Sequence, residues 1–246
     1  LHVNDILHPV MRETVRDYHV NQQFRRDIFV KGLRNLSNLE QRHLLRQVRV
    51  VLTTHADDIP MTVKGSLGEA QLQENIYRPV IDWLARHGVC SLNDMDAGLD
   101  DRVSFPAVIQ AVLILMGNGH ISLAQDEETI EAARPTSARL NQALCARARH
   151  SQDVAYLASP VTGGGIPVSR FNQLFLEAVR LGLNTPEEMA LSVWSILDEQ
   201  NQRIVKEGSP IETPEDNLAE LLSQAREFQT KKLPLFQTLG LSYEPA

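Results

Sequence analysis

The stretch "SFPAVIQAVLILMGNGH" (residues 104–120) contains the longest apolar run of the chain, which only Gln110 interrupts. It predicts a helix whose end is marked by Gly117 and Gly119, because glycine commonly ends helices. The stretch holds no Arg or Lys, so it lacks the donors with which a helix reads bases or contacts phosphates. We therefore expect a core helix or a helix that faces a protein partner.

The segments on either side of this helix complete a known order of elements. Residues 69–88 place apolar side chains on one helical face, and residues 91–99 predict a short capped turn or helix. A strand is predicted at 120–124, and we expect residues 153–159 to pair with it across a long helical insertion at 136–150. Helix, short helix, helix and hairpin is the order of a winged-helix domain, here with an insertion between the hairpin strands.

The first part of the chain has a different, α+β character. Residues 24–32 predict a short strand, and Ser37 and Glu40 are spaced as a capping box for the helix that follows. Residues 48–53 and 61–65 are rich in β-branched side chains, which predicts a strand, a loop and a second strand.

The last part of the chain is predicted to be helical throughout. Residues 169–183 repeat apolar side chains at helical spacing, and two later helices each begin with "TPE", a Thr N-cap followed by Pro at the first helical position. We therefore predict a mainly helical α+β fold in three parts. These are a small α+β domain at 1–68, a winged-helix-like domain with a helical insertion at 69–168, and a C-terminal helical region at 169–246 that packs on it.

Composition limits the classes of function. With 246 residues, 43% of them hydrophobic, the chain can bury a core as one large domain or two to three small ones. Its formal net charge of -7 disfavours a general attraction to nucleic acid or anionic lipid. No apolar run approaches the roughly 20 residues that span a bilayer, and no secretory signal is present. We expect a soluble, cytoplasmic protein with free thiols, and its start at Leu1 indicates a fragment, a processed product or a trimmed chain.

Three consecutive glycines, Gly163, Gly164 and Gly165, raise the question of a phosphate site. A P-loop needs a Lys directly after its last glycine, and this segment has none. A Rossmann fingerprint needs a third glycine or alanine where this chain has Val168. We predict a turn that leads into Pro167, with an anion or cofactor contact as the alternative.

Other short motifs of catalysis or metal binding do not occur. The chain lacks GxSxG, HExxH and CxxC, and its eight histidines are scattered. His55, Asp57 and Asp58 could ligate a metal, although a solvated loop is favoured. Residues 94–101 lack the central Gly and terminal Glu of a calcium loop. We expect no catalytic, metal-binding or cofactor-binding residue in this chain.

Positive charge gathers in the first part of the chain. The basic residues there are Arg25, Arg26, Lys31, Arg34, Arg42, Arg46 and Arg49. They are either solvated, ion-paired side chains, which is the favoured interpretation, or a docking surface for an acidic partner. RNA binding would need interleaved exposed aromatic side chains, and only 5% of the residues are aromatic. We therefore do not expect nucleic acid as a partner.

Two stretches carry a resemblance to a known family. "RDYHVNQQFRRDIFVKG" (16–32) resembles the opening of the methyltransferase regulatory domain that follows the catalytic domain of certain bacterial S-adenosylmethionine-dependent methyltransferases, including protein lysine methyltransferases. "LASPVTGGGIPVSRFNQLFLEA" (157–178) is similar to a segment late in those proteins, where a winged-helix domain and a helical tail follow. The resemblance covers nearly the whole chain. It implies a C-terminal accessory half that regulates the enzyme or presents its protein substrate.

The same resemblance limits what is carried over. The catalytic half of that family has an E/DxGxGxG loop, which this chain lacks, so no catalytic residue has a matching position. S-adenosylmethionine is therefore expected on a catalytic domain outside this chain.

The favoured function is a non-catalytic, regulatory or substrate-recognition part of an S-adenosylmethionine-dependent methyltransferase that acts on protein. Its expected partners are the catalytic domain in cis and a protein substrate, with no membrane contact; a homodimer stays open. The residues predicted to contact substrate or catalytic domain are Arg25, Arg26, Lys31, Arg34, Gly163, Gly164, Gly165 and Arg170. The alternative is a stand-alone winged-helix transcription regulator, and a weaker third is an enzyme whose active site short motifs do not reveal.

Overall fold

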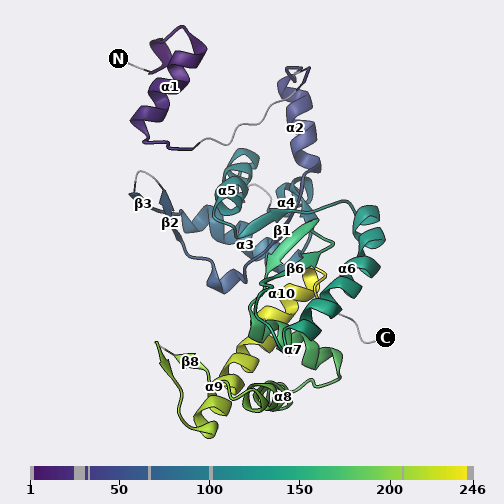
Figure 1. The fold of residues 1–246 in the computed structure, drawn as a ribbon. Coiled ribbons are helices and arrows are strands. Elements are labelled where there is room, and N and C mark those ends of the chain that lie inside the picture. The colour runs from purple at the N-terminus through teal and green to yellow at the C-terminus, as the bar shows by residue number, and fades with distance from the viewer. Residues whose placement is uncertain are drawn as a thin grey trace.

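The computed structural model describes residues 3–24, 31–32, 34–65, 68–99, 102–206 and 208–242. Over these residues the fold is mainly helical with small antiparallel sheets (Figure 1), which confirms the predicted α+β class. Most of the strand predicted at 24–32 lies outside the described residues. The division into parts at 1–68, 69–168 and 169–246 stays a prediction. The last part is not helical throughout, because Val205–Lys206 and Ser209–Pro210 pair as two short antiparallel strands.

The elements of the first half, in chain order, are η1 (Val3–Asp5), α1 (Pro9–His19), α2 (Asn38–Gln47), β1 (Arg49–Leu52), η2 (Ala56–Asp58), β2 (Thr62–Gly65), β3 (Gly68–Gln71), α3 (Glu74–His87), β4 (Cys90–Ser91), α4 (Leu92–Leu99) and α5 (Phe105–Gly117). Those of the second half are β5 (Ile121–Leu123), α6 (Glu127–Arg147), β6 (Tyr156–Ser159), β7 (Gly164–Pro167), α7 (Arg170–Arg180), α8 (Pro186–Glu199), β8 (Val205–Lys206), β9 (Ser209–Pro210), α9 (Pro214–Glu227), the π-helical segment η4 (Phe228–Lys232) and α10 (Leu233–Thr238).

Side-chain caps set the starts of several helices as the sequence predicts. Ser37 and Glu40 form the predicted capping box of α2, in which each side chain accepts the backbone N–H of the other residue. Thr185 and Thr213 cap α8 and α9, which confirms the two "TPE" starts. These caps satisfy N–H groups that the first turn of a helix leaves without a partner.

Strand β1 lies at the centre of the three-stranded sheet β4–β1–β5, in which both pairings are antiparallel. The predicted pairing of residues 120–124 with 153–159 is therefore wrong, since β5 pairs with β1 and β6 pairs with β7. β1 is apolar and β-branched and buries its last three side chains, so it suits the middle of a sheet. β6 instead meets β7 across the short turn at 160–163, which makes its pairing local.

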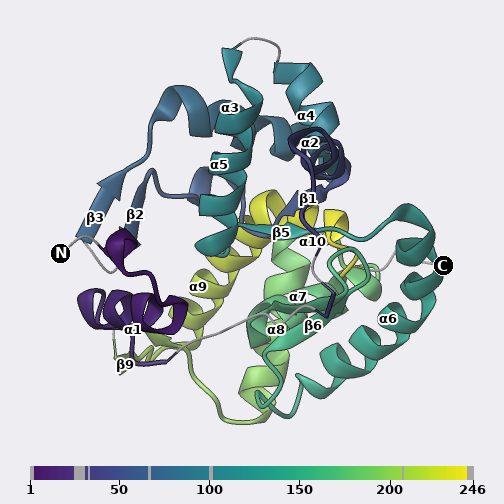
Figure 2. The same cartoon turned by 90° about the horizontal axis from the view of Figure 1, so that it is seen from above.

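β1 also separates two hydrophobic cores. Val50 and Leu52 belong to a cluster with α3, α4 and α5, whereas Val51 belongs to a cluster built mainly by α6 to α10. This division follows from the alternation of side chains along a strand. Figure 2 shows α3, α4 and α5 on one side of the sheet and α6 to α9 on the other. Leu235 of α10 packs against both clusters, so the C-terminal helix helps to join them.

Helix α5 is the helix predicted from the long apolar run in residues 104–120. It buries Val108, Val112 and Leu115 in the first core and packs on α3, which confirms the expectation of a core helix. Leu113 on its outer side is 60% exposed. Neither α5 nor any other helix of the described residues is long and apolar enough to cross a membrane.

Candidate functional site

The basic residues predicted as contacts lie in the first part of the chain. Arg25 and Arg26 fall outside the described residues. Lys31 is exposed, and Arg34 is exposed and pairs with Glu40, with 3.1 Å between Arg34 Nη2 and Glu40 Oε1. Hydrogen bonds from Ser37 and from Arg34 hold the pKa of the Glu40 carboxyl below its usual value. The contact role of these residues stays a prediction.

The three glycines form a turn and the start of a strand. Gly163 has φ of +69° and donates its N–H to the Ser159 carbonyl at 3.0 Å, as a turn requires. Gly164 and Gly165 lie in β7 and pair with β6. A Cβ at Gly163 would stand 2.6 Å from the Gln125 amide nitrogen, so a side chain already fills the space beside this turn. The structure confirms the turn, whereas a contact of these glycines with an anion, a cofactor or a partner stays a prediction.

Arg170 is placed where it joins three segments of the second core. Its Nε donates to the Ala148 carbonyl at 2.8 Å and its Nη2 to the Arg149 carbonyl at 3.1 Å, beyond the end of α6. Nη1 donates to Gln202 Oε1 at 2.7 Å, and Nη2 donates to Gln200 Oε1 at 3.3 Å. These four bonds give Arg170 a structural function inside the chain, whatever it also contacts outside.

The loop "HADDIP", which could have ligated a metal, makes contacts within the chain instead. Asp58 pairs with both Lys231 and Lys232, at 2.6 and 3.2 Å, and His55 caps η2 by accepting the Asp57 N–H. Among the described residues, no group of three or more His, Cys, Asp or Glu side chains is placed to hold a metal ion.

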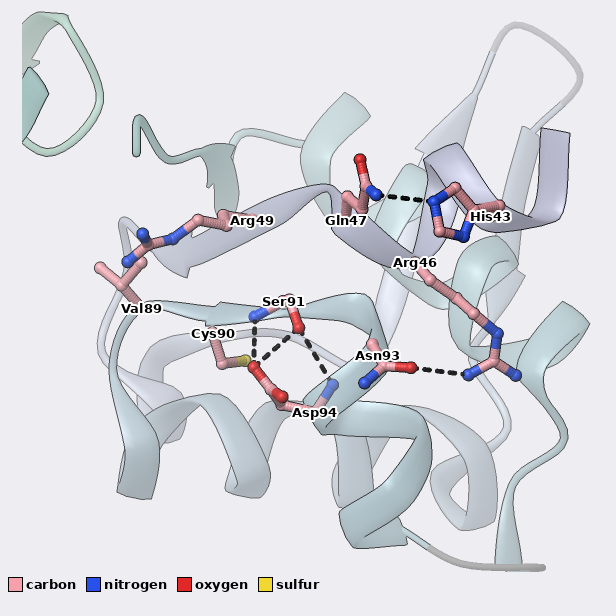
Figure 3. A pocket seen from close by; sticks show the side chains of 9 residues that line it. All are labelled: His43, Arg46, Gln47, Arg49, Val89, Cys90, Ser91, Asn93 and Asp94. Carbon is pink, nitrogen blue, oxygen red and sulfur yellow. Dashed lines mark hydrogen bonds between the residues drawn. The ribbon is translucent and has the colours of Figure 1, made fainter. Parts of the chain in front are cut away.

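The structure brings other basic residues together in two pockets that lie on different sides of α2 and share Arg46. The first is a pocket of about 600 Å³ between the end of α2, the start of β1 and the β4–α4 turn. Figure 3 shows Arg46 at one end of this pocket and Arg49 at the other, with Ser91, Asn93 and Asp94 along its floor. We call this pocket together with its neighbour on the other side of α2 the α2 groove.

Arg46 is held in place by three neighbours. Its Nη1 donates to Asn93 Oδ1 at 3.0 Å, and its Nη2 lies 2.6 Å from Asp96 Oδ2. The guanidinium also stands over the Phe105 ring, 4.4 Å from the ring centroid, as in a cation–π contact. The side chain keeps 34% of its surface exposed, so it is both fixed and accessible.

The neighbouring pocket, about 410 Å³, lies on the other side of α2 and is lined in part by Arg42, Leu45, Arg46, Phe105 and Ile109. Arg46 therefore lines both pockets. In the described part of the chain, Arg42 has no hydrogen-bond or ion-pair partner. The α2 groove thus offers one fixed cation, one free cation and apolar surface beside them, which suits the recognition of a polypeptide.

The first pocket of the α2 groove also contains a cysteine and a hydrogen-bonded pair of Ser and Asp. Burial raises the pKa of the Cys90 thiol to about 11, so Cys90 is a neutral thiol at physiological pH. Asp94 is bonded to both the N–H and the hydroxyl of Ser91, and the Asp94 N–H donates back to Ser91 Oγ. These reciprocal hydrogen bonds cap the start of α4.

The sequence shows that Arg42, Arg46 and Arg49 are basic, but it does not show which residues line the pockets beside them. Asn93 and Asp96 come from α4, far along the chain, and only the β1–β4 pairing brings them beside α2. The Ser91–Asp94 spacing is a capping signal that marks the start of α4, but it carries no sign of a pocket.

Comparisons with known proteins give one family model and one relative. The model described as "Predicted methyltransferase regulatory domain" matches residues 2–31. An uncharacterized protein of Synechocystis sp. is 34% identical over 243 residues, which is 98% of this chain and 47% of that protein. The chain therefore spans about half the length of this relative. No solved structure matches the chain.

Proposed function

We propose that this chain is the accessory, non-catalytic half of an S-adenosylmethionine-dependent methyltransferase, and that its α2 groove holds the protein substrate. The family match to a predicted methyltransferase regulatory domain supports the connection to methyl transfer. A relative of about twice the length leaves room for a catalytic half. The observation that carries the proposal is the free Arg42 beside the fixed Arg46, in a pocket that Leu45, Phe105 and Ile109 also line.

The mechanism is positioning. A substrate segment with an acidic residue would pair with Arg42, while its apolar side chains would cover the surface around Phe105. Holding the segment there raises the effective concentration of its target side chain near the methyl donor. The chain as a whole carries a net charge of -7, so this attraction acts only at short range.

S-adenosylmethionine supplies the methyl group when it is bound, and we place its site outside this chain. Within the described residues, the glycine-rich segment is the part that most resembles a cofactor loop, and Gln125 fills the space at its turn. The residues of this chain would therefore bind and orient the protein substrate rather than the cofactor.

Arg42→Ala in the native protein tests the proposal. The variant should raise the KM for the protein substrate about tenfold, the loss of roughly 1–2 kcal/mol expected of one charged contact. The Kd for S-adenosylmethionine should not change. Steady-state methyl transfer and cofactor titration measure the two quantities.

Arg139→Ala is the matched control, because Arg139 is also exposed and has no partner among the described residues. It lies on α6 and should leave both quantities unchanged. If Arg42→Ala behaves like Arg139→Ala, or weakens cofactor binding as much as substrate use, then the α2 groove does not hold the substrate.

A further inference from the structure

Helix α1 carries an apolar stripe that nothing in the described chain covers. Val10, Met11 and Tyr18 fall at the spacing of one face of α1 and are 69%, 58% and 83% exposed. Leu7, which directly precedes the His8 N-cap, is 97% exposed. No residue of α1 is buried, and among the described residues α1 packs substantially only on η1. In Figure 1, α1 stands apart from the helices of both cores. A contiguous exposed apolar stripe marks an interaction surface.

The length of α1 also calls for a partner. α1 has 11 residues, and isolated helices shorter than about 12–15 residues are marginal in water. The helix has a His8 cap and a proline at its first position, which help to start it. Most helix stability in proteins comes from packing of the apolar face, so α1 needs a surface against its stripe to persist.

The polar face of α1 favours a protein rather than a lipid surface. Arg12 and Arg16 share that face with Glu13 and Asp17, and Arg16 Nη1 lies 3.1 Å from Glu13 Oε2. Helices that lie on anionic lipid gather Lys and Arg on their polar face, whereas these charges balance. An amphipathic helix with a neutral polar face fits an apolar groove on a protein.

The match to a family model indicates which protein surface the apolar face of α1 would contact. The methyltransferase regulatory model matches residues 2–31, which contain α1, and it does not extend into the two cores. The segment that resembles a methyltransferase-associated family is therefore the segment that stands apart from the rest of this chain. The Synechocystis relative also has about half its length outside the matched region, enough for a domain that could supply a groove.

We propose that α1 docks through Val10, Met11 and Tyr18, together with the preceding Leu7, into an apolar groove on the methyltransferase half of the same protein. This inference rests on the proposed function, because it takes the methyltransferase half as the partner. Residues 20–37 join α1 to α2, so the docked helix would connect the methyltransferase half to the α2 groove.

Hydrogen–deuterium exchange on the native protein tests this docking. We expect the amides of α1 to exchange at least about tenfold more slowly than in an unprotected peptide, because docking removes the open state from which they exchange. The variant Met11→Ser with Tyr18→Ser should lose this protection. Both side chains are exposed in this chain, so neither core is altered.

Glu13→Ser with Arg16→Ser is the matched control. It also introduces two serines into α1 and leaves the net charge unchanged, but it changes the polar face. This control should keep the protection of α1. Equal loss in both variants would show that helix propensity, not docking, governs the exchange, and would overturn the proposal.

Two further outcomes separate this inference from the proposed function. If the native protein binds S-adenosylmethionine and transfers methyl groups while α1 exchanges like a free peptide, the docking is wrong and the function stands. If α1 is protected only after addition of phosphatidylserine vesicles, the stripe binds lipid and the docking is also wrong. If α1 is protected but no methyl transfer occurs, the proposed function fails and the helix docks on a domain of another kind.

Discussion

At the scale of single residues, close packing around a glycine determines whether a larger side chain can replace it. Gly98 in α4 lies directly under the indole of Trp83, and a Cβ there would stand 1.7 Å from Trp83 Cη2. Trp83 in turn stacks on His87, with ring centroids 3.8 Å apart, so the indole has little room to move. Gly98 is therefore required by packing between α4 and α3 rather than by backbone conformation.

Gly98→Ala should destabilise the protein by about 1–3 kcal/mol, because it overpacks a filled contact. Urea unfolding of the two proteins measures the difference. Gly117→Ala in α5 is the control, since a Cβ at Gly117 meets nothing within 4 Å. Alanine there should be neutral or stabilising by up to about 1 kcal/mol. Equal free energies of unfolding for both variants would contradict the packing described for Gly98.

At the scale of elements, local chemistry predicts the helices better than the strand pairings. Ser37 with Glu40, and Thr185 and Thr213 with their prolines, mark helix starts because the caps act within one turn. The pairing of β5 depends on β1, which is distant in sequence, and no local signal favours β1 over β6. For the same reason, the sequence does not indicate that Asn93 and Asp96 of α4 lie beside α2.

The junction between η2 and the π-helical segment η4 is an element contact with a predicted pH dependence. Hydrogen bonds from Lys231 lower the pKa of Asp58, and Lys232 adds to this effect. Because the folded-state pKa lies below the unfolded value, the stabilisation is complete above the unfolded pKa. It is lost as the pH falls through the folded-state pKa. Acid should therefore weaken this contact first at pH values below about 4.

Asp58→Asn should remove this part of the acid dependence. We expect it to lower the free energy of unfolding at neutral pH by about 1 kcal/mol or less, since the pair is partly exposed. At pH 3 the variant and the wild type should differ less than at pH 7. Asp57→Asn, whose carboxylate contacts neither lysine in the structure, is the control, and an effect as large as that of Asp58→Asn would contradict the assignment.

At the scale of the whole molecule, two cores joined at β1 and α10 carry the α2 groove on one side, while α1 stands apart from both (Figure 1). The sequence predicts the mainly helical fold and the absence of short catalytic motifs. The sequence analysis predicts neither helix α1 nor its open apolar face. An amphipathic pattern looks the same whether its partner lies inside or outside the chain. Under the proposed function, recognition belongs to this chain and methyl transfer to the other half of the protein.

The most direct test is to delete residues 1–246 from the native protein and to measure cofactor binding and substrate use side by side. Our account predicts that the remaining half keeps its Kd for S-adenosylmethionine, while kcat/KM for the protein substrate falls at least about a hundredfold through loss of positioning. If both quantities are lost to the same extent, or if substrate use survives the deletion, this chain does not hold the substrate for a methyltransferase.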